Sequence, residues 1–307
     1  MKKIIVGYTG FVGSNLSNQT HFDDFFNSKN ITQAFGSNPD LCVYAGLSAE
    51  KYIANANPLD DLSKVHEAIE NIQRINPKFL ILISTIDVYP LTQDKDETYD
   101  IPLTGKETYG RNRLILEKWV EENIREYLIV RLPALFGNGL KKNFIYDYIH
   151  RTPKMIKVQK FKELCPLNSD LEKYYTKNDS GFYQLKDLNK IEIDQLSLAL
   201  DKVGFTSLNF TDSRNQFQFY NLEHLWKHIQ IALKNDIKKI NLVSEPISAE
   251  TIFKHLENSE FTNHILHEPI RYDLKTIYYS LYNGEKGYIF TSKSVLEEIN
   301  EFTRGEE

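Results

Sequence analysis

The chain is poor in cysteine and has no long hydrophobic run, and each shortage excludes a class of protein. Its two cysteines, Cys42 and Cys165, are too few for a disulfide framework and lack the spacing of a metal site. Its apolar runs, such as residues 79–83, are far too short to cross a bilayer. The run after Lys2 and Lys3 ends at glycines without a cleavage site, which predicts a core strand rather than a signal peptide. We therefore expect a cytoplasmic protein without a membrane partner.

The chain also lacks a strong excess of positive or negative charge. The net charge is −5 in 307 residues with both signs mixed along the chain, so no nucleic-acid partner is indicated. We find no internal repeat and no low-complexity linker. Aromatic residues are abundant instead, with 18 tyrosines and 18 phenylalanines that crowd the C-terminal half. A chain of this length has room for one large α/β domain and a smaller one.

Three glycines, Gly7, Gly10 and Gly13, follow a short apolar run near the N-terminus. The run predicts a buried strand, the glycines predict a tight turn, and the pattern from Phe11 and Val12 onward predicts a helix. Glycine lets the backbone turn sharply and lets a ligand approach closely. The unpaired N–H groups at a helix start, together with the helix dipole, favour binding of a pyrophosphate. The spacing alone is also compatible with a glycine-rich turn that binds nothing.

A second strand is expected at residues 22–27, and the residues at its end bear on the choice of cofactor. Folds that bind NAD usually place a carboxylate there, which binds the ribose diol. This chain has Asn27, Ser28 and Lys29 instead. Their amide, hydroxyl and ammonium groups suit a ribose 2′-phosphate better, which favours NADP. The alternative is a polar turn that makes no cofactor contact.

Strands and helices alternate through the first half of the chain. Strands are expected at residues 41–46, 79–83 and 127–132, and helices at residues 60–75 and from residue 109 onward. The short interval before residue 41 means that the usual crossover helix is shortened or missing. The alternation predicts an α/β protein with a Rossmann-type doubly wound parallel sheet.

Side chains suited to chemistry stand where the predicted strands end. Ligands of open α/β sheets bind beyond the carboxyl ends of the strands. Ala45 and Gly46 end one predicted strand, and Ser84 and Thr85 end the next, with Asp87 shortly after them. We therefore expect these residues to lie at one edge of the sheet.

The helix from Tyr109 places Arg113, four residues on, on the same face. Four motifs follow one another along the chain in an order typical of one protein family. They are the glycine triplet, the strand end at residues 84–89, this pair and the segment 131–137. In these motifs the chain resembles the extended short-chain dehydrogenase/reductases, specifically the NAD-dependent epimerase/dehydratase family that modifies nucleotide sugars. The resemblance covers the first half well and the rest loosely.

The resemblance implies catalytic roles for several residues. Tyr109 is expected to be the acid/base for hydride transfer at a sugar carbon, with Thr85, or alternatively Ser84, bonding the same oxygen. The family has a lysine that binds the nicotinamide ribose and lowers the tyrosine pKa, whereas this chain has Arg113, which keeps the charge but cannot release a proton. Asp87 stands where dehydratases carry acidic residues. A single acid supports epimerisation or keto reduction better than dehydration, and a turn or helix-capping role is the alternative.

The resemblance also implies binding roles along the chain. The expected cofactor is NADP or NAD, with NADP favoured. Its expected contacts are Gly7, Gly10, Phe11, Val12, Gly13, Asn27, Ser28, Lys29, Ala45, Gly46, Tyr109, Arg113 and Pro133. Asn143 and Arg214 are the expected substrate contacts, since Arg214 opens a basic and aromatic segment where an arginine of the family often meets the sugar-nucleotide diphosphate.

The second half of the chain gives weaker signals. Residues 155–188 are predicted to be a long charged loop, either a lid or disordered, with a turn at residues 178–181. A short strand is expected at residues 207–210, after a helix at residues 193–203. Asn283-Gly284 indicates a hairpin whose aromatic residues either pack or form a binding platform.

These observations lead to a two-domain enzyme. Residues 1–140, with part of about 190–235, are expected to form a dinucleotide-binding domain, and residues 141–307 mainly a substrate-binding α/β domain. The expected activity is that of an NAD(P)-dependent nucleotide-sugar epimerase or keto-sugar reductase. The alternative is a non-catalytic NAD(P)-binding sensor or scaffold, which Arg113 and the shortened region after Asn27 favour. His224 and His228 have a zinc-like spacing but no third ligand, so no metal is expected, and a homodimer is compatible with the sequence.

Overall fold

The computed structural model describes residues 1–90, 92–104, 107–178 and 181–306 and divides the chain into two compact units. Unit 1 comprises Met1–Leu140, Gln216–Ile247 and Arg271–Glu298. Unit 2 comprises Lys141–Asn215, Ser248–Ile270 and the residues from Ile299 onward. The assignment of cofactor binding to one part of the chain and substrate binding to the other stays a prediction.

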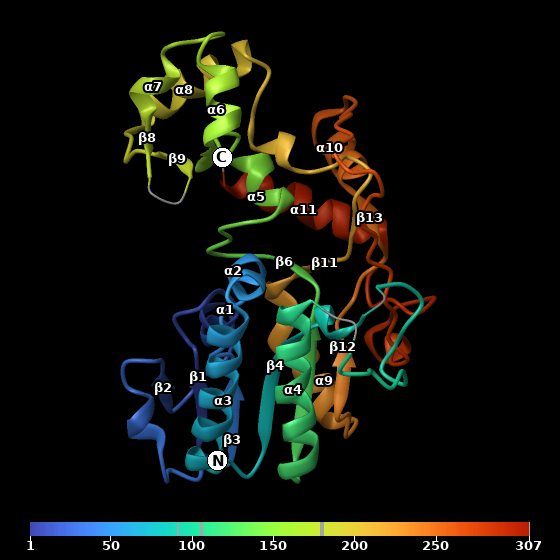
Figure 1. Cartoon of the computed structure of the whole chain (residues 1–307). Helices are drawn as coiled ribbons and strands as arrows, with labels where there is room; N and C mark the ends of the chain where they lie inside the picture. The colour runs from blue at the N-terminus through green and yellow to red at the C-terminus, as the bar shows by residue number, and fades with distance from the viewer. Residues whose placement is uncertain (91, 105–106, 179–180, 307) are drawn as a thin grey trace. The chain divides into compact units, whose positions relative to one another are not determined.

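Unit 1 is built on a six-stranded parallel sheet. Its strands are β1 (Lys3–Val6), β2 (Asp24–Phe26), β3 (Leu41–Tyr44), β4 (Leu80–Thr85), β5 (Tyr127–Leu132) and β12 (Lys239–Asn241), in the order β12-β5-β4-β3-β1-β2. The chain runs from β1 to β2 on one side and then returns to β3 on the other (Figure 1). The sheet therefore reverses its winding between β1 and β3, where ligands of such folds bind. This confirms the predicted α/β, Rossmann-type fold.

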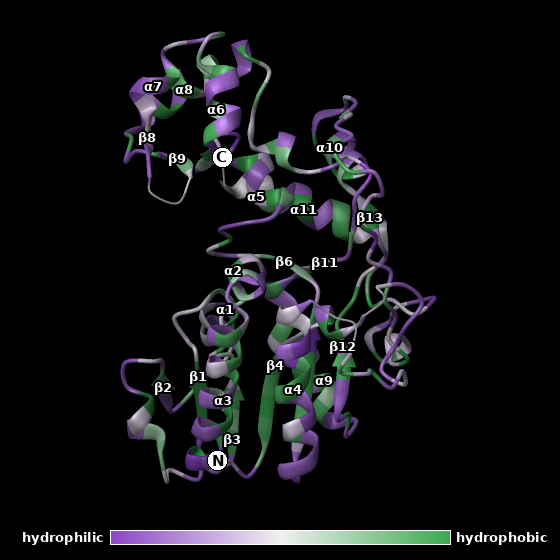
Figure 2. Ribbon diagram, viewed as in Figure 1, coloured by the Kyte–Doolittle hydropathy of each residue, from purple (hydrophilic) through white to green (hydrophobic). Residues whose placement is uncertain are grey.

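Helices cover both faces of this sheet because alternate strand residues point in opposite directions. Ile5 packs with Leu16 of α1 (Phe11–Gln19) and Leu225 of α9 (Leu225–Lys234). Ile4 packs on the other face with Val65 of α3 (Pro58–Ile75) and Leu116 of α4 (Thr108–Asn123). Figure 2 shows hydrophobic strands beneath helices that carry hydrophilic residues. Only the short 3₁₀ helix Ile31–Ala34 joins β2 to β3, as the sequence predicts.

Most of the further elements outside the small sheet of unit 2 are short, and the helix Ser292–Glu306 is the exception. They are α2 (Lys51–Ala56), β6 (Ala134–Phe136), α5 (Phe144–Ile149), β10 (Gln216–Phe217), β11 (Phe219–Asn221), β13 (Ile247–Ser248), α10 (Ala249–Glu257), α11 (Ser292–Glu306), and 3₁₀ helices at Ile86–Val88, Ser207–Phe210, Leu222–His224 and Tyr279–Tyr282. Among the helices described, none has the length and apolar character needed to span a bilayer.

Unit 2 contains a small antiparallel sheet where the sequence predicts a loop at residues 155–188. The sheet consists of β7 (Met155–Lys157), β9 (Phe182–Leu185) and β8 (Tyr175–Lys177), with α6 (Val158–Leu164), α7 (Leu171–Tyr174) and α8 (Lys190–Lys202) beside it. The loop prediction is wrong because an aromatic cluster holds these segments together: the Phe161 ring stacks on Tyr183 at 3.8 Å and meets Tyr175 at 5.6 Å. The predicted turn at 178–181 lies partly outside the described residues.

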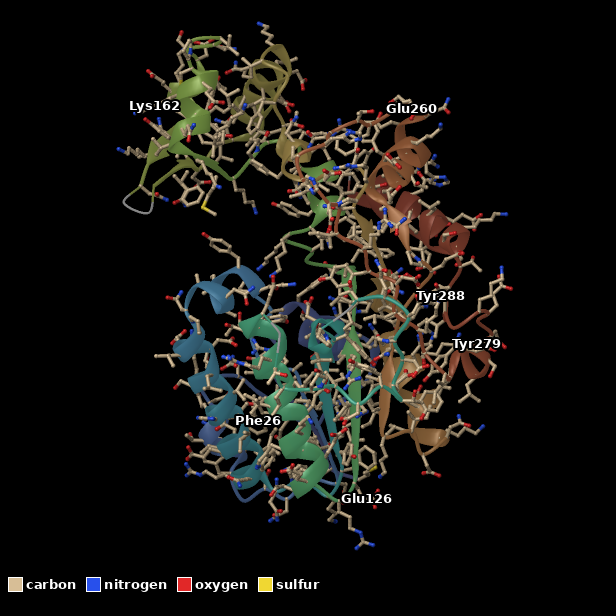
Figure 3. All side chains as sticks on the ribbon, turned by 45° about the vertical axis from the view of Figure 1, so that its right-hand side comes forward. Phe26, Glu126, Lys162, Glu260, Tyr279 and Tyr288 are labelled. Atoms are coloured by element: carbon tan, nitrogen blue, oxygen red, sulfur yellow. The ribbon has the colours of Figure 1, made fainter. Side chains whose placement is uncertain are left out.

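Two further local predictions are wrong. Residues 207–210 form a 3₁₀ helix rather than a strand, because Thr206 and Asn209 bond each other's backbone in a capping box. Asn283 does not turn a hairpin. It is a left-handed residue, with φ of 58°, that closes the 3₁₀ helix Tyr279–Tyr282, on the segment where Figure 3 labels Tyr279 and Tyr288.

A buried ion pair ties α4 to β5. Glu117 and Arg131 are each about 1% exposed, and the Arg131 Nη2 to Glu117 Oε2 distance is 2.6 Å. Arg131 also donates to the Tyr89 hydroxyl at 2.8 Å, and Ser84 Oγ donates to Glu117 Oε1 at 2.5 Å. Such a network is stabilising only while every member is paired, because an isolated buried charge is costly.

Replacement of Arg131 by methionine leaves Glu117 buried without its partner. We expect Arg131→Met to lower the free energy of unfolding by about 3–5 kcal/mol, measured by urea unfolding. The matched control is Arg125→Met, because the Arg125 side chain is 96% exposed, and its expected change is below about 0.5 kcal/mol. Equal stability of the two variants would contradict this assignment.

Candidate active site

The glycine loop brings β1, β3 and α1 into close contact. A Cβ at Gly7, where φ is +91°, would lie 2.4 Å from the Ala45 carbonyl oxygen, and one at Gly13 would lie 2.1 Å from that of Gly7. These positions therefore require glycine. Gly10 stands at the start of α1 and offers no side-chain cap to the helix. Consequently the N–H groups of the first helical turn are positioned for an anionic ligand.

A cavity of about 410 Å³ opens beside this loop. Among its lining residues are six that the sequence predicts to bind the cofactor: Gly7, Gly10, Asn27, Ser28, Ala45 and Gly46. Phe11 and Val12 belong to the first turn of α1. Lys29 is exposed and does not line the cavity, and its backbone N–H donates to Asn27 Oδ1 at 2.9 Å.

Lys64 and Glu67 of α3 also line this cavity, and sequence reasoning did not find them. Their only sequence signal is a helical spacing shared with Ala68 and Asn71, which line the same cavity. Lys64 pairs with Asp60 at 2.6 Å, which leaves its ammonium group near the cavity partly neutralised.

The end of β4 and the start of α4 bring Thr85 and Tyr109 together. Thr85 lies close enough to Tyr109 to lower its pKa as a hydrogen-bond partner, while Thr85 Oγ1 donates to Asp87 Oδ2 at 3.4 Å. Thr85 Oγ1 also accepts from the Asp87 backbone N–H at 3.2 Å. Ser84 instead donates to Glu117, so Thr85 is the hydroxyl that meets the tyrosine. A Cβ at Gly110 would lie 1.9 Å from the Asp87 carbonyl oxygen, so α4 approaches this closely only because residue 110 is glycine.

Arg113 is buried and fully engaged beside Tyr109. Its Nη1 and Nη2 atoms each lie 3.0 Å from a carboxylate oxygen of Asp61, and Nη2 donates to the Ser48 carbonyl at 2.7 Å. Its Cζ atom lies 4.5 Å from the centre of the Tyr109 ring. Asp61 escaped sequence reasoning because it lies 52 positions from Arg113, in the first turn of α3.

The electrostatic balance keeps the Tyr109 phenol protonated. Burial raises the pKa of Tyr109, and the negative charge of Asp87 acts in the same direction. The positive charge of Arg113 and the hydrogen bond from Thr85 act in the opposite direction but do not outweigh burial. The pKa therefore lies above its usual value of 10.

Asp87 is held by two residues that sequence reasoning missed, Lys51 and Tyr272. Its Oδ1 atom accepts from the Tyr272 hydroxyl at 2.7 Å and from Lys51 Nζ at 3.0 Å. Lys51 Nζ also lies 3.0 Å from a carboxylate oxygen of Glu107. No local motif signals this arrangement, because Tyr272 lies 185 positions from Asp87 in the chain.

The predicted substrate residues lie in unit 2. Asn143, with φ of +107°, caps α5 by accepting from Ile145 and Tyr146 N–H, and it lines a second cavity of about 860 Å³. Arg214 does not line this cavity. Its guanidinium forms two hydrogen bonds to Asp212, at 2.9 and 2.8 Å. Pro133, which joins β5 to β6, lines neither of these two cavities.

The cavity of unit 2 is rich in positive charge. Five lysines line it together with the aromatic residues Tyr146, Phe182, Phe205 and Phe210; the lysines are Lys141, Lys142, Lys154, Lys157 and Lys160. Burial raises the pKa of the Asp147 carboxyl in its lining to about 7, with Lys154 opposing the rise. Asp147 is therefore about half ionised at neutral pH and mostly neutral below it, while Glu163, also in the lining, pairs with Lys160 at 3.2 Å.

The two histidines with zinc-like spacing, His224 and His228, each contact a residue other than a histidine. His228 Nδ1 lies 2.9 Å from the Tyr220 hydroxyl, and His224 Nε2 lies 3.0 Å from Glu298. Within the described ranges, no group of three or more histidine, cysteine, aspartate or glutamate side chains is arranged to hold a metal ion.

Comparison with known proteins finds likeness in structure but not in sequence. No protein-family model and no curated protein matches the chain. Among solved structures, dTDP-4-dehydrorhamnose reductase from Yersinia enterocolitica matches with a TM-score of 0.63 and 14% identity over 100% of both chains. The Bacillus anthracis reductase of the same name, in complex with NADP, matches at 0.62 and 15% over 99% of both. The chain shares the fold of these reductases. A UDP-galactose 4-epimerase matches at 0.58 and 12%, over 99% of this chain and 97% of its own.

The Gly7 to Gly13 contact gives a direct test of the glycine loop. A methyl group at residue 13 forces α1 away from Gly7, so we expect Gly13→Ala to weaken NADPH binding about tenfold or more, measured by nicotinamide fluorescence. The control is Gly305→Ala, because a Cβ at Gly305 meets no atom within 4 Å. Unchanged NADPH affinity in Gly13→Ala would exclude this loop as the binding site.

Proposed function

We propose that the protein is an NADP-dependent reductase that reduces a keto group of a nucleotide sugar. The observation that carries the proposal is the proximity of Thr85 and Tyr109, at the carboxyl end of β4 and in the same unit as the glycine-lined cavity. A phenol and a hydroxyl arranged in this way can bond one carbonyl oxygen together. Such a pair supplies general-acid catalysis for reduction of a ketone.

The features of the first cavity support a dinucleotide, and NADP in particular. The glycine loop leaves room for a pyrophosphate where side chains would fill it. Asn27 and Ser28 line the cavity at the end of β2, where a carboxylate would repel a 2′-phosphate. The structurally similar reductase from Bacillus anthracis was crystallised with NADP. When bound, the nicotinamide supplies the hydride.

The state of Tyr109 favours reduction over epimerisation. A protonated phenol donates its proton to the oxygen of a ketone as hydride arrives, with Thr85 bonding the same oxygen. Epimerisation through a keto intermediate begins with oxidation of an alcohol, for which the tyrosine must act as a base. Since burial raises the pKa of Tyr109, the acid form is the prevalent one at neutral pH.

The cavity of unit 2 has, taken by itself, features that suit a nucleotide. Lysine side chains bind phosphate groups as point charges, and aromatic rings stack on a base. Asn143 lines this cavity, and its contact with substrate stays a prediction, whereas the guanidinium of Arg214 is engaged with Asp212. Within unit 2, the lysines are therefore better placed than Arg214 to meet a diphosphate.

The alternative is a binding protein of the same fold without turnover. Arg113 favours it, because its guanidinium is committed to Asp61 and Ser48 and cannot take over the proton transfer of a lysine. The two hypotheses differ in one outcome, which is consumption of NADPH in the presence of a keto sugar.

Removal of the Tyr109 hydroxyl tests the proposed acid. We expect Tyr109→Phe to lower kcat by about 100-fold or more on a panel of dTDP-, UDP- and GDP-linked 4-keto sugars. The Kd for NADPH is expected to stay within about twofold, because the ring and its contact with Arg113 remain. Tyr127→Phe, at the amino end of β5, is the matched control. Turnover by Tyr109→Phe at the wild-type rate would exclude this role.

The pH dependence tests the protonation state. Because the Tyr109 pKa is raised, the rate of ketone reduction is expected to stay flat between about pH 6 and pH 9. The reverse oxidation, which needs the phenolate, is expected to rise with pH across the same range. Steady-state rates in both directions give the comparison. A reduction rate that falls above about pH 7 would contradict a raised pKa.

A further inference from the structure

We propose that Lys51 and Asn55 of α2 position Tyr109 for catalysis by joining the end of β4 to the start of α4. The proposal rests on the function proposed above and assigns positioning residues to that same site. The three segments are distant in sequence, so their relative placement depends on side-chain contacts between them. Both contacts come from one short helix, Lys51–Ala56.

Lys51 makes the first connection. Its ammonium group lies 3.0 Å from Asp87, in the 3₁₀ helix after β4, and 3.0 Å from Glu107, the residue that precedes α4. One cation thus bridges two carboxylates that lie two residues from Thr85 and two residues from Tyr109 in the chain. Without it, these carboxylates would repel each other across the gap.

Asn55 makes the second connection, one helical turn further along α2. Its Oδ1 atom accepts from the Tyr109 backbone N–H at 2.9 Å. Its Nδ2 atom donates to Glu107 at 3.3 Å. Glu107 occupies the N-cap position of α4 but makes no side-chain cap bond, so Asn55 supplies the cap from another helix. The backbone of the proposed catalytic residue is therefore bonded directly to α2.

Asp87 is fixed from a second side as well. The Tyr272 hydroxyl donates to the same Oδ1 atom that Lys51 contacts, at 2.7 Å. Burial acts to lower the pKa of Lys51, but attraction to Asp87 and hydrogen bonds to Asp87 and Glu107 outweigh it, so the pKa is raised. Lys51 therefore keeps its charge, and the bridge persists, throughout the neutral range.

The effect of Lys51 on Tyr109 is one of position rather than of charge. The charged groups that dominate the pKa of Tyr109 are Arg113, Asp87 and Asp61. Arg113 holds the tyrosine ring from one side, and the contacts of α2 hold its backbone from the other. Loss of the bridge is therefore expected to misplace the phenol relative to Thr85 without a large change in its pKa.

Steady-state kinetics of two Lys51 variants and one control variant test the proposal. We expect Lys51→Met to lower kcat about tenfold or more with an unchanged Kd for NADPH and an unchanged shape of the pH profile, because misplacement by about 1 Å costs up to 100-fold. Lys51→Arg, which restores a cation, is expected to recover most of the rate. Lys78→Met is the control, since Lys78 pairs with Asp40 before β4 begins. Wild-type kcat in Lys51→Met would overturn the proposal.

Hydrogen exchange tests the same contacts without any substrate. In Asn55→Ala, the peptide covering residues 107–113 is expected to exchange faster than in the wild type, because the Tyr109 N–H loses its acceptor. In Lys51→Met the same peptide is expected to exchange faster because Glu107 loses its cation. Unchanged exchange in both variants would overturn the proposal. If the wild-type protein turns over no keto sugar, the proposed function fails, and the exchange result still decides whether α2 holds the start of α4.

Discussion

The whole site depends on the close approach of α4 to the end of β4. Gly110 permits it, because any side chain there would overlap the carbonyl of Asp87. This contact places Tyr109, the residue before the glycine, against Thr85. About two turns further along the same helix, Glu117 pairs with Arg131 of β5 and ties α4 to the neighbouring strand. The position of the phenol thus follows from packing that a single methyl group would disturb.

Paired charges around this contact set the chemistry that the site can perform. Arg113 is matched by Asp61, Arg131 by Glu117, and Lys51 by Asp87 and Glu107. Because each of these cations is neutralised by a carboxylate, burial decides the protonation of Tyr109. A phenol that stays protonated is an acid, which is what reduction of a ketone requires.

The sequence predicts the parts of this arrangement that local patterns encode. Glycine spacing reveals the loop at Gly7, and continuous apolar runs reveal strands buried on both faces. Contacts that join distant positions carry no such pattern. Nothing near Asp87 indicates Lys51 or Tyr272, and nothing near Arg113 indicates Asp61. The sequence does not predict the small sheet of unit 2 for a related reason. The Phe161 and Tyr183 rings that stabilise the sheet are separated in the chain by charged residues. At Thr206 and Asn283, local side-chain and backbone bonds override the expected strand and hairpin.

The most direct test of the central claim is the fate of the hydride. NADPH deuterated at the transferred position of the nicotinamide is incubated with a 4-keto nucleotide sugar and the protein, and the product sugar is analysed by mass spectrometry and NMR. The account predicts one deuterium on the carbon that carried the ketone. Tight binding of NADPH without any deuterium in the sugar, across dTDP-, UDP- and GDP-linked substrates, would contradict it and favour a binding protein.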